Sequence, residues 1–216
     1  MKALNSPQTA KHASWEYAEQ HHTDDPVLEA ARLRADDLGV TPVSEGVAAT
    51  LTVLASASRA RSLVEVGTGV GVSGLCLLRG ATSDAVLTSI DPDADHLHAA
   101  RMTFKEASFP AARTRLITGR AEEVLPRLTS AAYCMVHIDA EDSGLEESVE
   151  HGVRLLRTGG LLVLNDALDH DRLPRPAVRE ETTQRRRAVE RALRDDDRLI
   201  TTMLGTGTGL LVAVRR

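Results

Sequence analysis

A carboxylate followed directly by a glycine-rich turn is the part of this sequence best suited to chemistry. The stretch Glu65–Gly71 reads E-V-G-T-G-V-G, and Ser73 follows it. Glycines in such a turn let a ligand approach bare main chain, because no Cβ blocks the contact. The helix expected to follow presents free N–H groups and a partial positive charge at its N-terminus. The stretch therefore predicts a site for a nucleotide-like ligand that carries a carboxylate or a phosphate.

Two kinds of nucleotide fit these residues. Gly69–Gly74 matches the dinucleotide pattern G-x-G-x-x-G, but it begins two residues beyond the end of the expected strand at Gly67. Glu65 would repel a pyrophosphate, whereas it could hold an amine or a ribose hydroxyl. Asp91 is placed to accept hydrogen bonds from a ribose of either ligand. These residues alone leave an adenosine and a dinucleotide both open.

Alternating strands and helices must position this turn. We expect strands at 62–66, 86–90, 114–118, 133–138 and 161–164, with helices at 47–57, 72–78, 93–107, 121–128 and 145–156. This alternation predicts an α/β fold with a doubly wound, mostly parallel sheet and helices on both faces. Strands at 199–204 and 210–214, joined by a Gly-Thr repeat, predict a C-terminal antiparallel hairpin that completes seven strands.

The remaining segments fit one domain over residues 1–216. Residues 1–13 are expected to be a polar tail, and 14–57 to form N-terminal helices that cover the site. Asp24-Asp25-Pro26 is a helix start, since an acidic residue precedes a proline of the first turn. Thr158-Gly159-Gly160 is expected to end the helix before it. The run Arg185–Arg187 is interpreted as one solvated face of a helix at 179–194, because glutamates flank it.

The composition is that of an ordinary globular protein. The chain has 216 residues, 42% hydrophobic, with a net charge of -5, which argues against general nucleic-acid binding. Cys76 and Cys134 fall in apolar segments and are expected to be buried free thiols of a reducing compartment. We find neither an apolar leader nor a membrane-spanning run, and so predict a cytoplasmic protein without membrane contacts.

Together these stretches resemble class I S-adenosylmethionine-dependent methyltransferases, whose signature is close to Glu65–Gly71 followed by Ser73. Within that class the chain is similar to the small cation-dependent O-methyltransferases of the catechol and caffeoyl-CoA type. Segments 87–93, 119–126, 138–140 and 155–160 carry this resemblance. So does the closing segment 207–213, where Thr208 replaces the family's Asp. The resemblance extends from Trp15 to the C-terminus.

The resemblance implies a set of contacts to S-adenosylmethionine. The methionine part would pack on one side chain, the amino-acid end would be held at the turn, the ribose by one carboxylate, and the adenine beside the next residues. In that order these are Val43; Glu65, Gly67, Thr68 and Ser73; Asp91; Pro92 and Ala121. Asp139 would lie at the sulfonium as the catalytic residue.

The family's divalent cation would be held by Asp139, Asn165 and Asp166. The last two stand in reversed order, since the family has Asp then Asn. All three offer the hard oxygen ligands that Mg²⁺ accepts. The family's Lys three residues after the first Asp is replaced here by Asp142, which cannot lower the pKa of a hydroxyl as a cation does.

The resulting hypothesis is an O-methyltransferase that acts on a hydroxyl of a small-molecule acceptor, assisted by Mg²⁺ or a similar ion. Trp15 and Tyr17 would close the acceptor pocket and contribute to a homodimer contact, and His170 or Asp171 could help activate the substrate. His137 is expected in the core, and the pair His21-His22 at the surface. One alternative is a binding module that keeps S-adenosylmethionine but has lost transfer. Another is a nicotinamide-dependent dehydrogenase that binds NAD.

Overall fold

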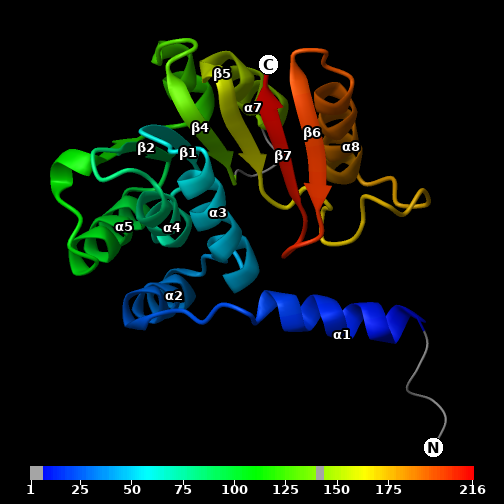
Figure 1. The fold of residues 1–216 in the computed structure, drawn as a ribbon, viewed down its shortest axis with the longest axis horizontal. Coiled ribbons are helices and arrows are strands. Elements are labelled where there is room, and N and C mark those ends of the chain that lie inside the picture. Colours follow the sequence, from blue (N-terminus) through cyan, green and yellow to red (C-terminus); the bar gives the residue numbers. More distant parts are fainter. Residues whose placement is uncertain (1–6, 140–143) are drawn as a thin grey trace, which may run out of the picture.

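A seven-stranded sheet organises the computed structural model, which describes residues 7–139 and 144–216 (Figure 1). Its spatial order is β3-β2-β1-β4-β5-β7-β6. The first five strands run parallel, and β7 runs antiparallel to both β5 and β6. The predicted doubly wound sheet and terminal hairpin are confirmed. The strands are β1 (Ser62–Val66), β2 (Val86–Asp91), β3 (Thr114–Thr118), β4 (Tyr133–Ile138), β5 (Leu156–Leu164), β6 (Leu199–Leu204) and β7 (Leu210–Arg215).

Helices cover both faces of the sheet. One apolar core joins α2 through α5 to the first face, and a second joins α7 and α8 to the opposite face. No helix in the described part of the chain is both long and apolar enough to span a membrane. The helices are α1 (Pro7–Glu19), α2 (Pro26–Leu38), α3 (Glu45–Ala57), α4 (Val72–Gly80), α5 (Ala94–Glu106), α6 (Ala121–Val124), α7 (Leu145–Leu155) and α8 (Glu181–Arg194), with 3₁₀ turns η1 (Ala111–Arg113) and η2 (Leu125–Arg127).

The N-terminal helices differ from the expectation at one end. Helix α1 already begins at Pro7, so the prediction of a tail up to residue 13 is wrong for residues 7–13. Proline is compatible with a first helical turn, where its missing N–H has no intrahelical partner to lose. The predicted start of α2 is confirmed, because Asp25 accepts hydrogen bonds from the N–H groups of Val27 and Leu28. In Figure 1, α1 extends sideways below the sheet.

The glycines expected to end a helix instead shape strand β5. This strand begins at Leu156, directly after α7, rather than at Leu161. Gly159 has a φ of +76°. The register of β4 against β5 shifts between Tyr133 and Met135. Thr158–Gly160 therefore realigns the strand, a use of glycine that a helix-stop pattern does not distinguish.

The prediction that the arginine run is a solvated face is wrong for two of its members. Arg186 is only 8% exposed and lies against Asp166 and Asp169, with side-chain separations of 3.4 and 3.8 Å. Arg187 donates to main-chain carbonyls of the loop before α8, including Leu173 at 3.0 Å. Sequence patterning places such charges outside because it cannot see acids and carbonyls brought to them from another segment.

Both cysteines match the prediction. Cys76 and Cys134 are free and buried. Burial raises the pKa of the Cys76 thiol to about 11. Cys76 is therefore a packing residue rather than a reactive one.

The parallel strands bring their carboxyl ends to one edge. Beyond the strand ends, Gly67 N donates to Ile90 O, Asp139 N to Val66 O and Asn165 N to Ile138 O, each at 2.9 Å. The ladder thus continues by one residue on three neighbouring strands. It sets Gly67, Asp139 and Asn165 side by side at this edge.

Candidate functional site

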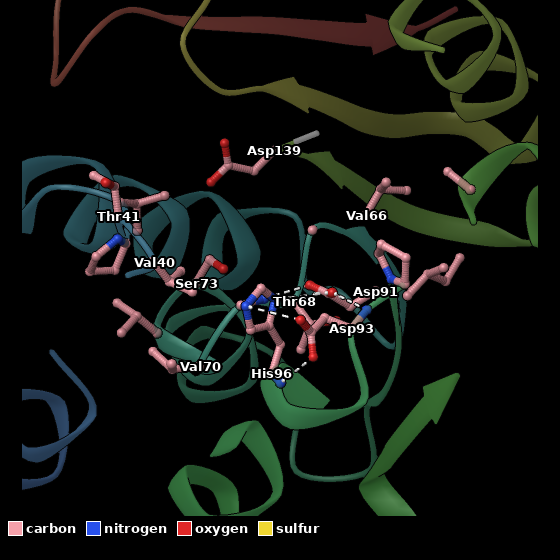
Figure 2. Close-up of a pocket in the computed structure, with 18 of the residues that line it drawn as sticks. Val40, Thr41, Val66, Thr68, Val70, Ser73, Asp91, Asp93, His96 and Asp139 are labelled. Carbon is pink, nitrogen blue, oxygen red and sulfur yellow. Dashed lines mark hydrogen bonds and ion pairs between the residues drawn. The ribbon is translucent and has the colours of Figure 1, made fainter. Parts of the chain in front are cut away.

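A cavity of about 640 Å³ opens at this carboxyl edge, a size typical of small-molecule sites (Figure 2). Its walls come from the loop before α3, the turn after β1, the end of β2, the start of α6 and Asp139. Every predicted cofactor residue except Glu65 lines it. These are Val43, Gly67, Thr68, Ser73, Asp91, Pro92, Ala121 and Asp139.

The glycine turn packs too closely for side chains. Gly67 has a φ of +86°, and a Cβ there would lie 2.0 Å from the main-chain oxygen of Asp139. Gly71, at a φ of +87°, precedes the first residue of α4. The chain can therefore cross from β1 to α4 with its main chain against the cavity, as the pattern predicts.

Glu65 lies behind the cavity wall instead of in it. Its side chain is 0% exposed. Ser73 donates to Oε1 at 2.7 Å, and Ser89 donates to Oε2. His137, predicted to be core, is fully buried with Nδ1 3.7 Å from Oε1. Glu65 thus holds Ser73, which does line the cavity, and its direct contact with a ligand stays a prediction.

We expect Glu65→Gln to act mainly on stability. Gln keeps one acceptor oxygen but presents an amide N–H₂ donor to the second serine hydroxyl, so one hydrogen bond to a charged group, about 1.5–3 kcal/mol, is lost. For a chain of this size this corresponds to a fall in Tm of about 3–12 °C, measurable by calorimetry. Glu123→Gln, at a position away from the buried network, is the matched control. An unchanged Tm with lost ligand affinity would contradict the supporting role.

Asp91 is held at the end of β2 by the turn and by α5. Oδ2 accepts from Gly69 N at 2.9 Å, and Oδ1 accepts from Asp93 N at 2.9 Å. His96 Nδ1 lies 3.2 Å from Oδ1. Figure 2 shows these groups on one side of the cavity and Asp139 on the other. The carboxylate is thus fixed in orientation before any ligand arrives.

His96 is a cavity residue that the sequence analysis missed. It comes from the first turn of α5, whose N-cap is Asp93. The spacing from Asp91 could have identified it. His96 follows Asp91 by five residues, in the first turn of a helix that starts beside the end of β2. Thr41, Val70 and Arg120, in loops and turns, and Glu122, in the first turn of α6, were missed too, because no such spacing marks them.

Asp139 pairs with Asn165. Asn165 Nδ2 donates to Asp139 Oδ1 at 2.9 Å. Burial raises the pKa of the Asp139 carboxyl above its usual value. Asn165 does not line the cavity, so it acts on the site through Asp139.

Asp166 turns away from this pair. Its φ is +49°. Oδ1 accepts from His170 N at 3.1 Å, and Oδ2 lies 3.4 Å from Arg186 Nη2. Within the described residues, no three or more His, Cys, Asp or Glu side chains gather closely enough to hold a metal ion. Glu141 and Asp142 lie outside the described residues.

A second cavity, of about 580 Å³, adjoins the first. Val43 lines the first cavity and Ser44 the second, so consecutive residues form the wall between them. Trp15 lines the second cavity, whereas Tyr17 is 76% exposed and is not among its lining residues. Its described lining is His12, Trp15, Glu16, Glu19, Gln20, Ser44, Glu45, His170, Asp171, Gly207 and Thr208. His21 and His22 are exposed, as predicted.

Glu19 fastens α1 over this second cavity. Ser44 Oγ donates to its Oε2 at 2.7 Å, and Gly207 N to its Oε1 at 2.8 Å. Thr206 Oγ1 also donates to Oε1. Burial alone would raise the pKa of Glu19, but these hydrogen bonds lower it below the ordinary 4.5. The ionised carboxylate therefore ties the end of α1 to α3 and to the β6–β7 turn.

The lowered pKa predicts acid release of α1. The stabilisation is present above the ordinary pKa of glutamate and is lost as the pH falls through the lower folded value. The fluorescence of Trp15, the single tryptophan, should therefore change below about pH 4.5 in the wild type. Glu19→Gln should already show the released signal at pH 7. Glu16→Gln is the control on the same helix. An identical response from both variants would contradict the role of Glu19 in holding α1.

Comparison with known proteins identifies relatives over most of the chain. The family model described as O-methyltransferase matches residues 22–216. A relative in Mycobacterium ulcerans named as an O-methyltransferase is 44% identical over 199 residues, covering 92% of this chain and 89% of the relative. One in Mycobacterium tuberculosis is 44% identical over 201 residues, covering 93% and 90%.

Solved structures share the fold. A protein from Corynebacterium glutamicum superposes with a TM-score of 0.87 at 28% identity, covering 95% of this chain and 97% of that one. The O-methyltransferase TomG of Streptomyces achromogenes, solved in complex with SAM, gives 0.85 at 23% identity, covering 98% and 99%. The family match covers all seven strands and every residue that lines the first cavity. This chain therefore belongs to the O-methyltransferase family.

Proposed function

We propose that the chain transfers a methyl group from S-adenosylmethionine to a hydroxyl of a small-molecule acceptor. The observation that carries the proposal is the cavity in which a glycine turn, Asp91 and Asp139 meet at one edge of the sheet. Membership of the O-methyltransferase family supports it. So does the complex with SAM of a protein of the same fold.

Each part of the donor has a partner in the proposed complex. Asp91 accepts hydrogen bonds from the ribose hydroxyls, with His96 beside it. The main chain of the turn, Thr68 and Ser73 hold the amino-acid end at the N-terminus of α4, where free N–H groups favour a carboxylate. Val43 packs on the methionine chain, and Pro92 and Ala121 flank the adenine. Asp139 places a negative charge near the sulfonium.

Methyl transfer needs little covalent help from the protein. The acceptor oxygen attacks the methyl carbon, the S–C bond breaks as the O–C bond forms, and the sulfonium becomes a neutral thioether. The hydroxyl proton leaves to solvent. Holding donor and acceptor in line supplies most of the acceleration, up to about 7–11 kcal/mol for ideal alignment. The residues lining the two adjoining cavities are proposed to do this.

The divalent ion of the resembling family does not fit the residues described. Asp166 faces Arg186, and Asn165 turns its donor toward Asp139. We therefore propose no step that uses an ion.

The acceptor is proposed to enter the second cavity. Glu16, Glu19, Glu45 and Asp171 line it, and its described lining contains neither Lys nor Arg. An acceptor with an amine should therefore be preferred over one with a carboxylate. We expect about a tenfold higher kcat/KM for a hydroxyphenyl ethylamine than for the matching propanoate, falling with added salt. Glu16→Gln/Asp171→Asn should narrow the ratio, and equal rates in the wild type would contradict this assignment.

The cofactor is tested by a thermal shift. S-adenosylmethionine and S-adenosylhomocysteine should each raise Tm, and NAD should not, because only a bound ligand stabilises the folded state. Turnover of a panel of hydroxyl acceptors, followed by mass spectrometry, then separates an enzyme from a binding module. Binding without transfer to any acceptor would favour the module, and a shift with NAD alone would favour the dehydrogenase. A homodimer and a cytoplasmic location remain predictions, the first open to sedimentation.

A further inference from the structure

We propose that the order Asn165-Asp166 replaces a cation site by a hydrogen-bonded pair, Asp139 with Asn165, so that methyl transfer here is independent of a divalent ion. The inference rests on the proposed function for its reaction. Its evidence is the geometry of three features at the end of β5: the direction of each side chain, the partner of Asp166 and the amide atom that faces Asp139.

Position 165, and not position 166, faces Asp139. Asn165 N donates to Ile138 O, so residue 165 continues the ladder of β5 against β4. Its side chain lies 2.9 Å from the Asp139 carboxylate. Residue 166 leaves the strand at a φ of +49°. The reversed order therefore puts an amide, and not a carboxylate, at the position that faces Asp139.

The carboxylate of Asp166 is already engaged with a positive side chain. Arg186 Nη2 lies 3.4 Å from Oδ2, and Arg186 Nη1 donates to the main-chain oxygen of Asp166 at 2.9 Å. Asp169, 1% exposed, adds a second carboxylate on the same guanidinium, 3.8 Å away. To bind a cation, Asp166 would have to leave Arg186 and bring the ion close to a buried positive charge, which is unfavourable.

Asn165 also presents the wrong atom. The amide end that faces Asp139 is the donor Nδ2, which donates to Oδ1 of that carboxylate at 2.9 Å. A metal ligand would have to be Oδ1. Asn165 Oδ1 is buried and has no hydrogen-bond partner among the described residues, and turning it toward Asp139 would break the bond that Nδ2 makes there. Asp139 would then be the single carboxylate of the site, the low end of the one or two that hold Mg²⁺ in proteins.

Direct binding of Mn²⁺ tests the proposal. The full chain, saturated with S-adenosylhomocysteine, is titrated with Mn²⁺ and followed by electron paramagnetic resonance. The wild type should show no saturable site that depends on Asp139. Asn165→Asp puts a second carboxylate against Asp139 and should bind Mn²⁺ at least about tenfold more tightly, since affinity follows the charge of the ligands.

Two further variants complete the test. Asn165→Asp/Asp166→Asn keeps the net charge and should also gain Mn²⁺ binding. Asp139→Asn/Asn165→Asp removes one of the two facing carboxylates and should lose it. Saturable Mn²⁺ binding in the wild type that Asp139→Asn abolishes would overturn the proposal. So would the absence of binding in both variants that combine Asn165→Asp with an intact Asp139.

Activity gives an independent readout. Methyl transfer by the wild type should be the same, within about twofold, in EDTA and in Mg²⁺. Loss of activity in EDTA that Mg²⁺ restores would overturn the inference and leave the proposed function standing. Absence of S-adenosylhomocysteine binding or of any transfer would instead defeat the proposed function, while the Mn²⁺ titrations could still be read on the unliganded chain.

Discussion

Gly67→Ala is expected to abolish ligand binding at the cavity. The new Cβ would lie 2.0 Å from the main-chain oxygen of Asp139 and 2.9 Å from its carbonyl carbon. Main chain cannot yield as the end of a flexible side chain can, so β1 and β4 must separate at the edge where the ladder now joins them. Residue 67 also has a φ of +86°, which costs a residue with a Cβ about 1–2 kcal/mol.

The clash with Asp139 and the backbone strain at residue 67 should lower both stability and ligand affinity. We expect a fall in Tm of more than about 8 °C, which for this chain length means over about 3 kcal/mol. We also expect no thermal shift with S-adenosylmethionine, since Asp139 and the turn move together. Calorimetry and the ligand titration measure these effects separately.

Gly39→Ala is the control for backbone strain alone. Gly39 also has a positive φ, +66°, but a Cβ there would meet nothing within 4 Å. It should cost about 1–2 kcal/mol and leave ligand binding measurable. Equal effects of the two substitutions would show that strain, and not the approach of β4, makes glycine necessary at position 67.

Local signals in the sequence were enough for most of the sheet. Strands such as 62–66 and 133–138 are apolar runs bounded by turns, and their predicted limits agree with β1 and β4. Parallel strands then bring their carboxyl ends to one edge, which is why the turn at Gly67 and Asp91 could be placed together from the residues themselves. Asp139 was added by the resemblance to the methyltransferase family. The cavity residues at the ends of β1 and β2 were therefore predictable from local pattern and topology.

The burial of individual polar side chains depends on contacts between distant segments and could not be predicted. Glu65 sits at a strand end like Asp91, but Ser73 and Ser89 enclose its carboxylate. The residues around Arg186 in the sequence are polar and predict an exposed side chain. It is buried because Asp166 and Asp169, which precede it by 20 and 17 residues, are brought against it by the turn after β5. No spacing rule within a helix or strand carries this information.

Asp91→Asn is expected to weaken binding of S-adenosylhomocysteine by about 10- to 150-fold, the equivalent of one lost hydrogen bond to a charged group, about 1.5–3 kcal/mol. The carboxylate of Asp91 accepts from Gly69 N and from Asp93 N, one on each oxygen. An amide has a single acceptor oxygen, so one of these N–H groups loses its partner. The substitution also removes the negative charge that lies beside His96 and faces the proposed ribose hydroxyls.

Isothermal titration separates this effect from general damage to α5. Asp95→Asn removes an exposed carboxylate from the first turn of the same helix and should change affinity by less than about twofold, since its charge only complements the helix dipole. If both variants bound equally well, Asp91 would only brace the turn through Gly69. Oδ2 braces the turn through Gly69, and Oδ1, which already accepts from Asp93 N, is the oxygen proposed to accept from the ribose as well. Asp91→Asn should therefore also weaken the binding of adenosine alone, which lacks the amino-acid end. An adenosine affinity unchanged from the wild type would place the ribose elsewhere in the cavity.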